Sequence, residues 1–143
     1  MREYKFRGKC VTSEDGEFSG EWVVGWFLMN PTSKGDEIPT ITDGFYEYEV
    51  DPETVGQYTS LKDKNGVEIY EGDILKIPDL YETPENTYPT YHNEVIDFDE
   101  CAFRLGGQLL AYDIDYISEE CEVIGNIFED GGLVDDYKKS KDD

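Results

Sequence analysis

The order of apolar and polar residues predicts a chain built mainly of short β-strands. Residues 3–11 and 45–50 alternate apolar and polar side chains, which is typical of strands with one buried face. Residues 21–29 form a more continuous apolar run and predict a further strand. Residues 30–38, which a proline, a glycine and several polar residues interrupt, are expected to form a loop.

Asn65-Gly66 is the clearest local signal in the chain. It stands between two expected strands, at 55–59 and 67–70. Both residues of an Asn-Gly dipeptide tolerate positive φ, which a tight hairpin turn requires. Further short strands are expected at 74–77, 94–98, 101–105 and 123–128.

Few segments favour anything other than strands. Residues 113–121 predict a short helix or turn, and residues 78–92, with three prolines, predict a mobile loop. Seven to nine short strands at this spacing indicate a mainly β fold (β-rich α+β). We expect a small barrel-like core of short antiparallel strands with one or two short helices.

Length and charge narrow the class of protein. The chain has 143 residues, about one domain, with 12 Lys and Arg against 34 Asp and Glu, a net charge of −22. Its longest apolar runs are three or four residues, whereas a membrane span needs roughly 18. No apolar stretch follows the first residues, so we expect no secretory signal and a cytoplasmic location.

The charge is unevenly distributed. Residues 1–9 carry +3, from Arg2, Lys5, Arg7 and Lys9 against Glu3, so the remainder carries −25. Such acidity repels phosphates and anionic membranes, so we expect no direct nucleic-acid binding and no membrane partner. A basic protein, a cation or an oppositely charged patch on a second copy fits better, and solubility alone is the simplest interpretation.

The basic N-terminal strand leaves an alternative open. Its cations lie beside Tyr4 and Phe6, and a basic strand with aromatics can contact nucleic acid. Pairing with the acidic remainder, within one chain or between subunits, is the favoured interpretation. Trp22, Trp26, Tyr58 and Tyr70 are expected to be core or interface aromatics.

Cysteine and histidine offer no ready site. Cys10, Cys101 and Cys121 are far apart in a chain without a CxxC motif, which favours a reducing compartment and buried thiols. His92 is the only histidine and stands in the predicted loop without a cysteine nearby. A structural role is therefore expected for it rather than metal or base chemistry.

Acidic pairs are plentiful but unspecific. Asp97 with Asp99 and Glu100, or Asp113 with Asp115, could hold Ca²⁺ or Mg²⁺. Because alternate strand residues share a face, Asp97 and Asp99 are equally the solvated side of a strand whose core side holds Ile96 and Phe98.

An EF-hand reading fails. With Asp63 and Asn65 at positions three and five of such a loop, Leu61 and Gly72 would occupy positions one and twelve, which need carboxylates. The sequence therefore identifies no catalytic, cofactor-binding or metal-binding residue, and no cofactor is expected.

The stretch from Val50 to Ile74, VDPETVGQYTSLKDKNGVEIYEGDI, closely resembles the core of the YopX family. Tyr4–Lys9 with Trp22–Gly25, and Glu122–Glu129, are similar to its N- and C-terminal parts, so the resemblance covers roughly residues 2–130. Ser60 departs from the family, which more often has glycine there. This departure bears on local turn geometry only.

The resemblance implies a phage or prophage protein that acts in the bacterial host cytoplasm, with a mainly β, barrel-like core. We therefore expect one YopX-like domain over 1–137, with an N-terminal part at about 1–50 and a barrel-like part at about 51–130. Chain ends are commonly frayed, and we expect this of residues 138–143. The resemblance implies no mechanism and no catalytic residue.

Three functional hypotheses follow. The first is a non-enzymatic accessory protein that binds another protein or self-assembles into a homo-oligomer. The alternative is an acidic nucleic-acid mimic that inhibits a host DNA- or RNA-processing enzyme, because carboxylates can stand in for phosphates. An enzyme is the least favoured, and its site would be sought first in residues 57–73.

Overall fold

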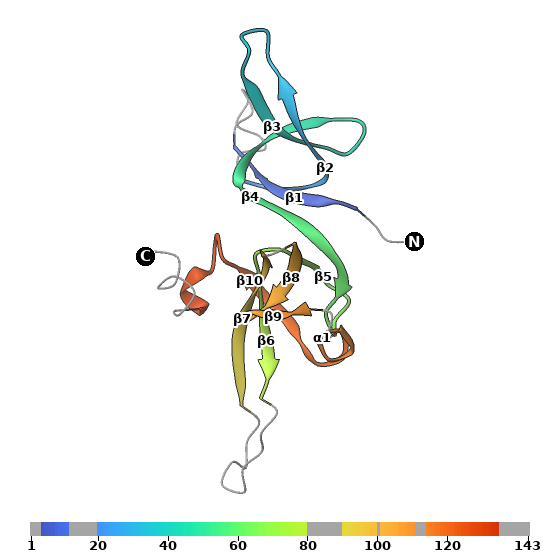
Figure 1. Cartoon of the computed structure of the whole chain (residues 1–143), viewed down its shortest axis with the longest axis vertical. Helices are drawn as coiled ribbons and strands as arrows, with labels where there is room; N and C mark the ends of the chain where they lie inside the picture. The colour runs from blue at the N-terminus through green and yellow to red at the C-terminus, as the bar shows by residue number, and fades with distance from the viewer. Residues whose placement is uncertain (1–3, 12–19, 80–89, 100, 111–113, 135–143) are drawn as a thin grey trace, which may run out of the picture. The chain divides into compact units, whose positions relative to one another are not determined.

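The computed structural model describes residues 4–11, 20–79, 90–99, 101–110 and 114–134 (Figure 1). The fold is mainly β, as predicted, and its described part contains one α-helix. The chain divides into two compact units, Met1–Tyr58 and Thr59–Asp143, of which each is considered by itself. The elements are β1 (Phe6–Cys10), β2 (Trp22–Pro31), β3 (Glu37–Thr42), β4 (Glu47–Lys62), β5 (Glu68–Tyr70), β6 (Asp73–Pro78), β7 (Tyr91–Asp99), β8 (Ala102–Leu105), β9 (Gln108–Leu109), α1 (Ile114–Glu120), β10 (Glu122–Asn126) and the 3₁₀ turn η2 (Gly131–Leu133).

The strands of the first unit close into a ring. β1 pairs with β2, β2 with β3 and β3 with β4, and β1 also pairs with β4, all antiparallel. The inner side of this ring is lined by Phe6, Phe27, Cys10, Ile41 and Val50, of which the last three are at most 4% exposed. Because the strands pair into a closed ring, a single layer of strands encloses the core of this unit.

Gly25 is the point where β2 changes partners. Residues 22–25 pair with β1, and residues 26–31 pair with β3. A Cβ at Gly25 would collide with the carbonyl oxygen of Thr42. The close approach of the two strands at this corner therefore requires glycine.

β4 is one strand where the sequence predicted two, at 45–50 and 55–59. Arg7 pairs with Gly56 but Lys9 pairs with Asp51, so β4 bulges between these two pairings. The bulge accommodates Pro52, and the Thr54 hydroxyl accepts a hydrogen bond from the Lys9 N–H at 2.8 Å. A side chain thus replaces the lost ladder partner, which the alternation pattern does not reveal.

The loop predicted at 30–38 is wrong at both ends. β2 continues to Pro31 and β3 begins at Glu37, and Asn30 pairs with Ile38. The turn between them is short because the Thr32 N–H donates to the Asp36 carbonyl oxygen at 2.7 Å. Backbone pairing to β2 stabilises a strand that Pro39 made hard to recognise from the sequence.

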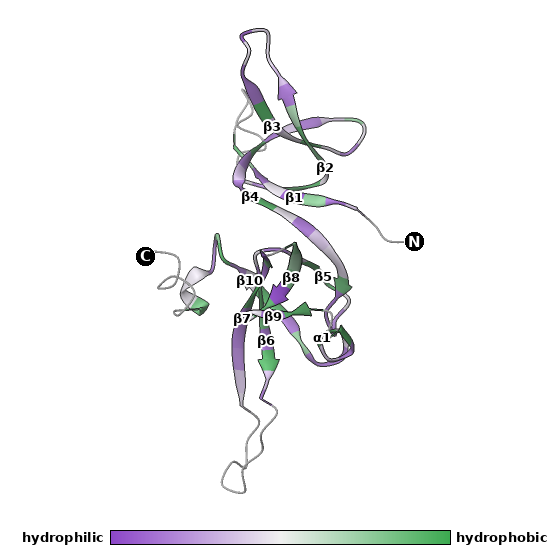
Figure 2. Ribbon diagram, in the orientation of Figure 1, coloured by the Kyte–Doolittle hydropathy of each residue, from purple (hydrophilic) through white to green (hydrophobic). Residues whose placement is uncertain are grey.

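The second unit contains an antiparallel sheet in the order β10-β6-β7-β8-β9. The strands expected at 74–77, 94–98 and 101–105 and the helix expected at 113–121 are confirmed. Hydrophobic stretches of β6 stand out in green in Figure 2. The core comprises Ile69, Leu75, Ile77, Ile96, Leu105, Leu110, Ile117 and Cys121, all at most 6% exposed.

Other expectations fall partly outside the described ranges. Residues 80–89, within the predicted loop, and the tail at 138–143 are among the residues that are not described. Tyr91 and His92, however, belong to β7 and not to a loop. In the described ranges, no helix has the length and apolar character that crossing a bilayer demands.

Candidate functional site

The central segment that the sequence would search first is a structural element. Asp63 is 4% exposed, and its Oδ1 accepts hydrogen bonds at 2.9 Å from the N–H groups of Asn65 and Val67. This arrangement forms the predicted turn, with Gly66 at φ +80°. Asp73, 1% exposed, accepts from the Tyr70 N–H at 2.7 Å. These carboxylates stabilise the backbone.

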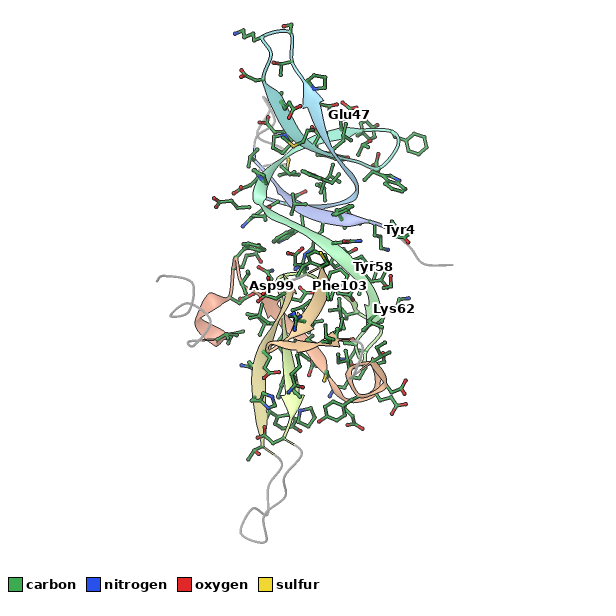
Figure 3. All side chains as sticks on the ribbon, viewed as in Figure 1. Tyr4, Glu47, Tyr58, Lys62, Asp99 and Phe103 are labelled. Atoms are coloured by element: carbon green, nitrogen blue, oxygen red, sulfur yellow. The ribbon has the colours of Figure 1, made fainter. Side chains whose placement is uncertain are left out.

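The basic strand β1 contacts aromatic rings of its own unit. The Lys5 ammonium lies 4.7 Å from the ring centre of Tyr58, which is labelled in Figure 3. The Arg7 guanidinium lies 4.9 Å from the Trp22 ring. Cation–π contacts of this kind stabilise the unit and partly occupy the charges that a nucleic acid would need.

The outer side of the ring in unit 1 exposes large apolar side chains. Val24 and Trp26 alternate with inward residues of β2 and are 45% and 61% exposed. Trp26 pairs with Thr42, after which the turn to β4 carries Phe45 and Tyr46, 91% and 67% exposed. Tyr46 points to the opposite side, with its ring centre 6.4 Å from that of Tyr48, so we call Val24, Trp26 and Phe45 the aromatic face.

The turn that carries Phe45 is held by hydrogen bonds. The Oδ1 atom of Asp43 accepts hydrogen bonds at 2.8 Å from the N–H groups of Phe45 and Tyr46. The bond from Tyr46, then that from Phe45, lowers the pKa of Asp43 below its usual value. The Thr42 hydroxyl donates to the Tyr46 carbonyl oxygen at 2.8 Å, and Gly44 has φ +96°. These bonds therefore hold the backbone of the turn from which the exposed Phe45 ring projects.

Carboxylates flank the aromatic face. Thr42 pairs with Glu47 and Thr40 with Glu49, so both glutamates lie on the same side of the sheet as Trp26. Both are exposed, and Glu47 is labelled in Figure 3. An apolar patch with an acidic border is thus built from β2, β4 and the turn at Asp43–Tyr46.

A pocket of about 220 Å³ lies in the second unit. His92 and Glu94 line it together with Tyr116 of α1 and the apolar side chains of Ile77 and Leu105. Ile77 pairs with His92, and Ile96 with Leu105, so the two polar residues of β7 continue the row of its buried Ile96. Polar side chains therefore occupy the core-facing side of a strand at the point where the core ends.

His92 lies between two carboxylates. Its Nδ1 is 2.6 Å from Oδ1 of Asp79, and its Nε2 is 3.6 Å from Oε1 of Glu94. Hydrogen bonds from the Thr90 hydroxyl and from His92 lower the pKa of Asp79, which keeps it ionised. The Tyr116 hydroxyl donates to the Pro78 carbonyl oxygen at 2.6 Å and closes one side of the pocket.

Sequence reasoning missed this grouping because it placed His92 in a loop. Apolar–polar alternation does not extend the expected strand to residue 92, because His92 and Glu94 are both polar although they lie in one row with Ile96. The acidic pairs that the sequence suggested as cation ligands are not part of this grouping. Asp97 pairs with Arg104 on the opposite side of β7, whereas Glu100 and Asp113 lie outside the described ranges.

The three thiols differ in exposure. Cys10 and Cys121 are buried, as expected, but Cys101 is exposed, so the expectation of a buried thiol there is wrong. Cys101 has φ +63° in the turn between β7 and β8, where the chain reverses at the surface. Burial, then Glu21 and Glu49, raises the pKa of the Cys10 thiol.

Comparison with known proteins supports a fold and a family. No curated protein matches the chain. The crystal structure of protein EF1440 from Enterococcus faecalis is similar at a TM-score of 0.53 and 23% identity, over 94% of this chain and all of that one. This likeness concerns the fold alone. The family model described as YopX protein matches residues 25–135, so the chain belongs to the YopX family.

Proposed function

We propose that this chain is a non-enzymatic accessory protein that binds another protein through the aromatic face of its first unit. The observation that carries the proposal is the ring of Phe45, 91% exposed on a turn that three side-chain hydrogen bonds hold in place. An exposed large apolar group has a hydration cost that docking removes. Because the backbone of the turn is already held, docking needs to order only the side chain of Phe45, which lowers the entropic cost.

The neighbours of Phe45 support a docking role. Trp26 is 61% exposed on the adjoining strand, and tryptophan and tyrosine are the residues that most often dominate binding energy in protein interfaces. Single exposed apolar residues are ordinary, but several on one part of a small unit are typical of an interaction surface.

The charges favour one kind of partner. Glu47 and Glu49 border the aromatic face, and the whole chain carries −22. A partner whose apolar patch is rimmed by Lys or Arg complements this surface. The opposite charges also raise the rate constant of association. A second copy of the chain fits less well, because two bodies of net charge −22 repel each other.

The family suggests where such a partner would be found. We infer from the resemblance that the chain is phage- or prophage-encoded and acts in the cytoplasm of a bacterial host. The partner would then be a host or phage protein in that compartment.

The test is a comparative pull-down from lysate of the host, with the full chain as bait. We expect at least one protein to be captured by the natural chain and by the Val67→Ser control, whose side chain is a 47% exposed apolar group in the second unit. We expect the double variant Trp26→Ser with Phe45→Ser to lose it. Capture that is equal for all three baits would overturn the proposal.

A salt series separates the acidic-mimic alternative. If the chain is an acidic mimic, the captured protein should be a nucleic-acid-processing enzyme that competitor DNA displaces from the bait. The double variant Glu47→Gln with Glu49→Gln should then lose this enzyme, whereas the double variant Trp26→Ser with Phe45→Ser should retain it. Under our proposal the aromatic variant loses the partner at both low and high salt, because apolar contacts are not screened. Recovery of the bait alone, with a doubled mass in sedimentation, would instead favour self-assembly.

A further inference from the structure

We propose that His92 and Glu94 bind a divalent transition-metal ion of the Zn²⁺ class, and that Asp79 is a positioning residue for His92. The site would lie in the pocket of the second unit and is independent of the aromatic face. The proposal goes beyond what the sequence predicted, since His92 was expected to have a structural role only.

The contact with Asp79 determines which nitrogen of His92 is available. A carboxylate only accepts hydrogen bonds, and Oδ1 of Asp79 lies 2.6 Å from Nδ1, so the proton of a neutral imidazole lies on Nδ1. The Nε2 atom then carries a free lone pair. This is the arrangement in which metal-binding histidines are usually found, with a carboxylate on the far nitrogen that fixes ring orientation and raises basicity.

The distance to Glu94 fits an ion between the two groups. Nε2 and Oε1 are 3.6 Å apart, too far for a hydrogen bond, and both are acceptors when the imidazole is neutral. Zn–N and Zn–O bonds of about 2.1 Å at a tetrahedral angle separate their ligand atoms by ~3.4 Å. A side-chain adjustment of a few tenths of an ångström is therefore enough for both atoms to ligate one ion.

The surroundings of the pair favour a cation. Leu105 and Ile77 line one part of the pocket, whereas the side chains of His92 and Glu94 are 46% and 34% exposed, so an ion can reach both ligand atoms from solvent. Lys76 lies on the opposite side of β6, with its ammonium 4.3 Å from the Tyr91 ring, so it does not neutralise the site. The second unit has 7 Lys and Arg against 22 Asp and Glu, a net charge of −15 that attracts dications.

The number of ligands defines the kind of site. In the described ranges, no three His, Cys, Asp or Glu side chains are grouped to hold a metal, and Asp79 is engaged with the other nitrogen of His92. The chain therefore supplies two ligands, and water would fill the remaining positions. We expect affinity well below that of closed structural zinc sites, with imidazole selecting Zn²⁺ over Mg²⁺.

The single histidine makes the test direct. Zn²⁺ is titrated into the untagged full chain while the imidazole C–H resonances of His92 are followed by NMR, and the dissociation constant is measured by calorimetry. We expect saturable shifts of these resonances with Zn²⁺ and none with equal Mg²⁺. Absence of a His92 shift at millimolar Zn²⁺ would overturn the proposal.

Variants assign the ligands. His92→Gln and Glu94→Gln should abolish saturable binding, and Asp79→Asn should weaken it by about 10-fold, as loss of an orienting carboxylate usually does. Asp97→Asn removes the same charge from the opposite side of β7, and Cys101→Ser removes the exposed thiol. Both should leave the dissociation constant unchanged. Binding that survives His92→Gln, or that Asp97→Asn weakens as much as Glu94→Gln does, would show general attraction to an acidic chain.

Discussion

The side chain of Asp63 accepts a hydrogen bond of 2.8 Å from the backbone N–H of Val123, 60 positions further along the chain. Asp63 belongs to the central stretch that carries the family resemblance, and Val123 belongs to the C-terminal one. The Lys64 N–H also donates to the Cys121 carbonyl oxygen at 3.0 Å, and the Ile127 N–H to that of Gly72 at 2.9 Å. These hydrogen bonds therefore link the two motifs to each other within the second unit.

Replacement of Asp63 should therefore destabilise the second unit strongly. Asp63→Ala leaves three backbone N–H groups without their acceptor, and we expect a loss of about 3 kcal/mol in the free energy of unfolding. Urea unfolding followed by circular dichroism measures it. Glu53→Ala, at an exposed position of the β4 bulge, is the control and should change stability by less than ~0.5 kcal/mol. Equal effects of the two substitutions would contradict the assigned role.

Ser60 is expected to be a suboptimal residue. It has φ +72°, a conformation that favours glycine, and its hydroxyl is buried with no hydrogen-bond partner among the described residues. Ser60→Gly should raise the free energy of unfolding by about 0.5–1 kcal/mol. Ser60→Ala removes the hydroxyl but keeps the strained backbone, so it should stabilise less. A stability ranking with alanine above glycine would show that the hydroxyl, not φ, dominates.

These residues show what the sequence could and could not predict. The Asn65-Gly66 turn was predictable because its dipeptide has a specific backbone preference, and Ser60 was noticed because it departs from a family pattern. β3 and the full length of β4 were not predictable, because Pro39 and Pro52 are tolerated only through partners elsewhere in the ring. Local pattern does not contain such long-range pairing.

The pocket was missed for a related reason. Asp79 and His92 are 13 positions apart, and the pairing of β6 with β7 brings them together. Local alternation neither extends β7 to His92 nor identifies Asp79 as its neighbour. The aromatic face was likewise hidden, since local pattern does not show that Trp22 is half-buried with Arg7 4.9 Å from its ring whereas Trp26 is 61% exposed.

Gly25 should be the most sensitive glycine in the first unit. Gly25→Ala places a methyl group against the Thr42 carbonyl, so either β2 or β3 must shift, and we expect destabilisation by about 2–3 kcal/mol. Both tryptophans of the chain are in β2, so their fluorescence during urea unfolding reports on this unit. Gly132→Ala, in the second unit, where a Cβ meets nothing within 4 Å, is the control for glycine replacement in general and should leave the tryptophan transition unchanged. If both variants unfold at the same urea concentration, the close approach at the corner is not tight in solution.

The three thiols should react at well-separated rates. Cys101 is exposed, whereas Cys10 and Cys121 are 4% and 0% exposed. The raised pKa of Cys10 further lowers its thiolate fraction near neutral pH. We expect one fast equivalent with a disulfide reagent in the native chain and three in denaturant. Cys101→Ser should remove the fast phase, and a fast phase that persists in this variant would show that one of the buried thiols becomes accessible.

Asp43 should make the free energy of unfolding of the first unit decrease as the pH falls. Its pKa is lowered in the folded chain by the N–H groups of Tyr46 and Phe45, so its stabilisation is present above the unfolded value near 4. It is lost as the pH falls through the lowered folded value. Asn at this position still accepts hydrogen bonds but does not titrate, so Asp43→Asn isolates the charge. We expect the free energy of unfolding, measured by tryptophan fluorescence, to be higher for the natural chain than for Asp43→Asn at pH 6. This difference should shrink below pH ~4.

A difference that stays constant across this range would mean that the bonds to Phe45 do not depend on the charge of Asp43. The turn that presents Phe45 would then have to be held by the bond from the Thr42 hydroxyl to the Tyr46 carbonyl oxygen and by the backbone of Gly44.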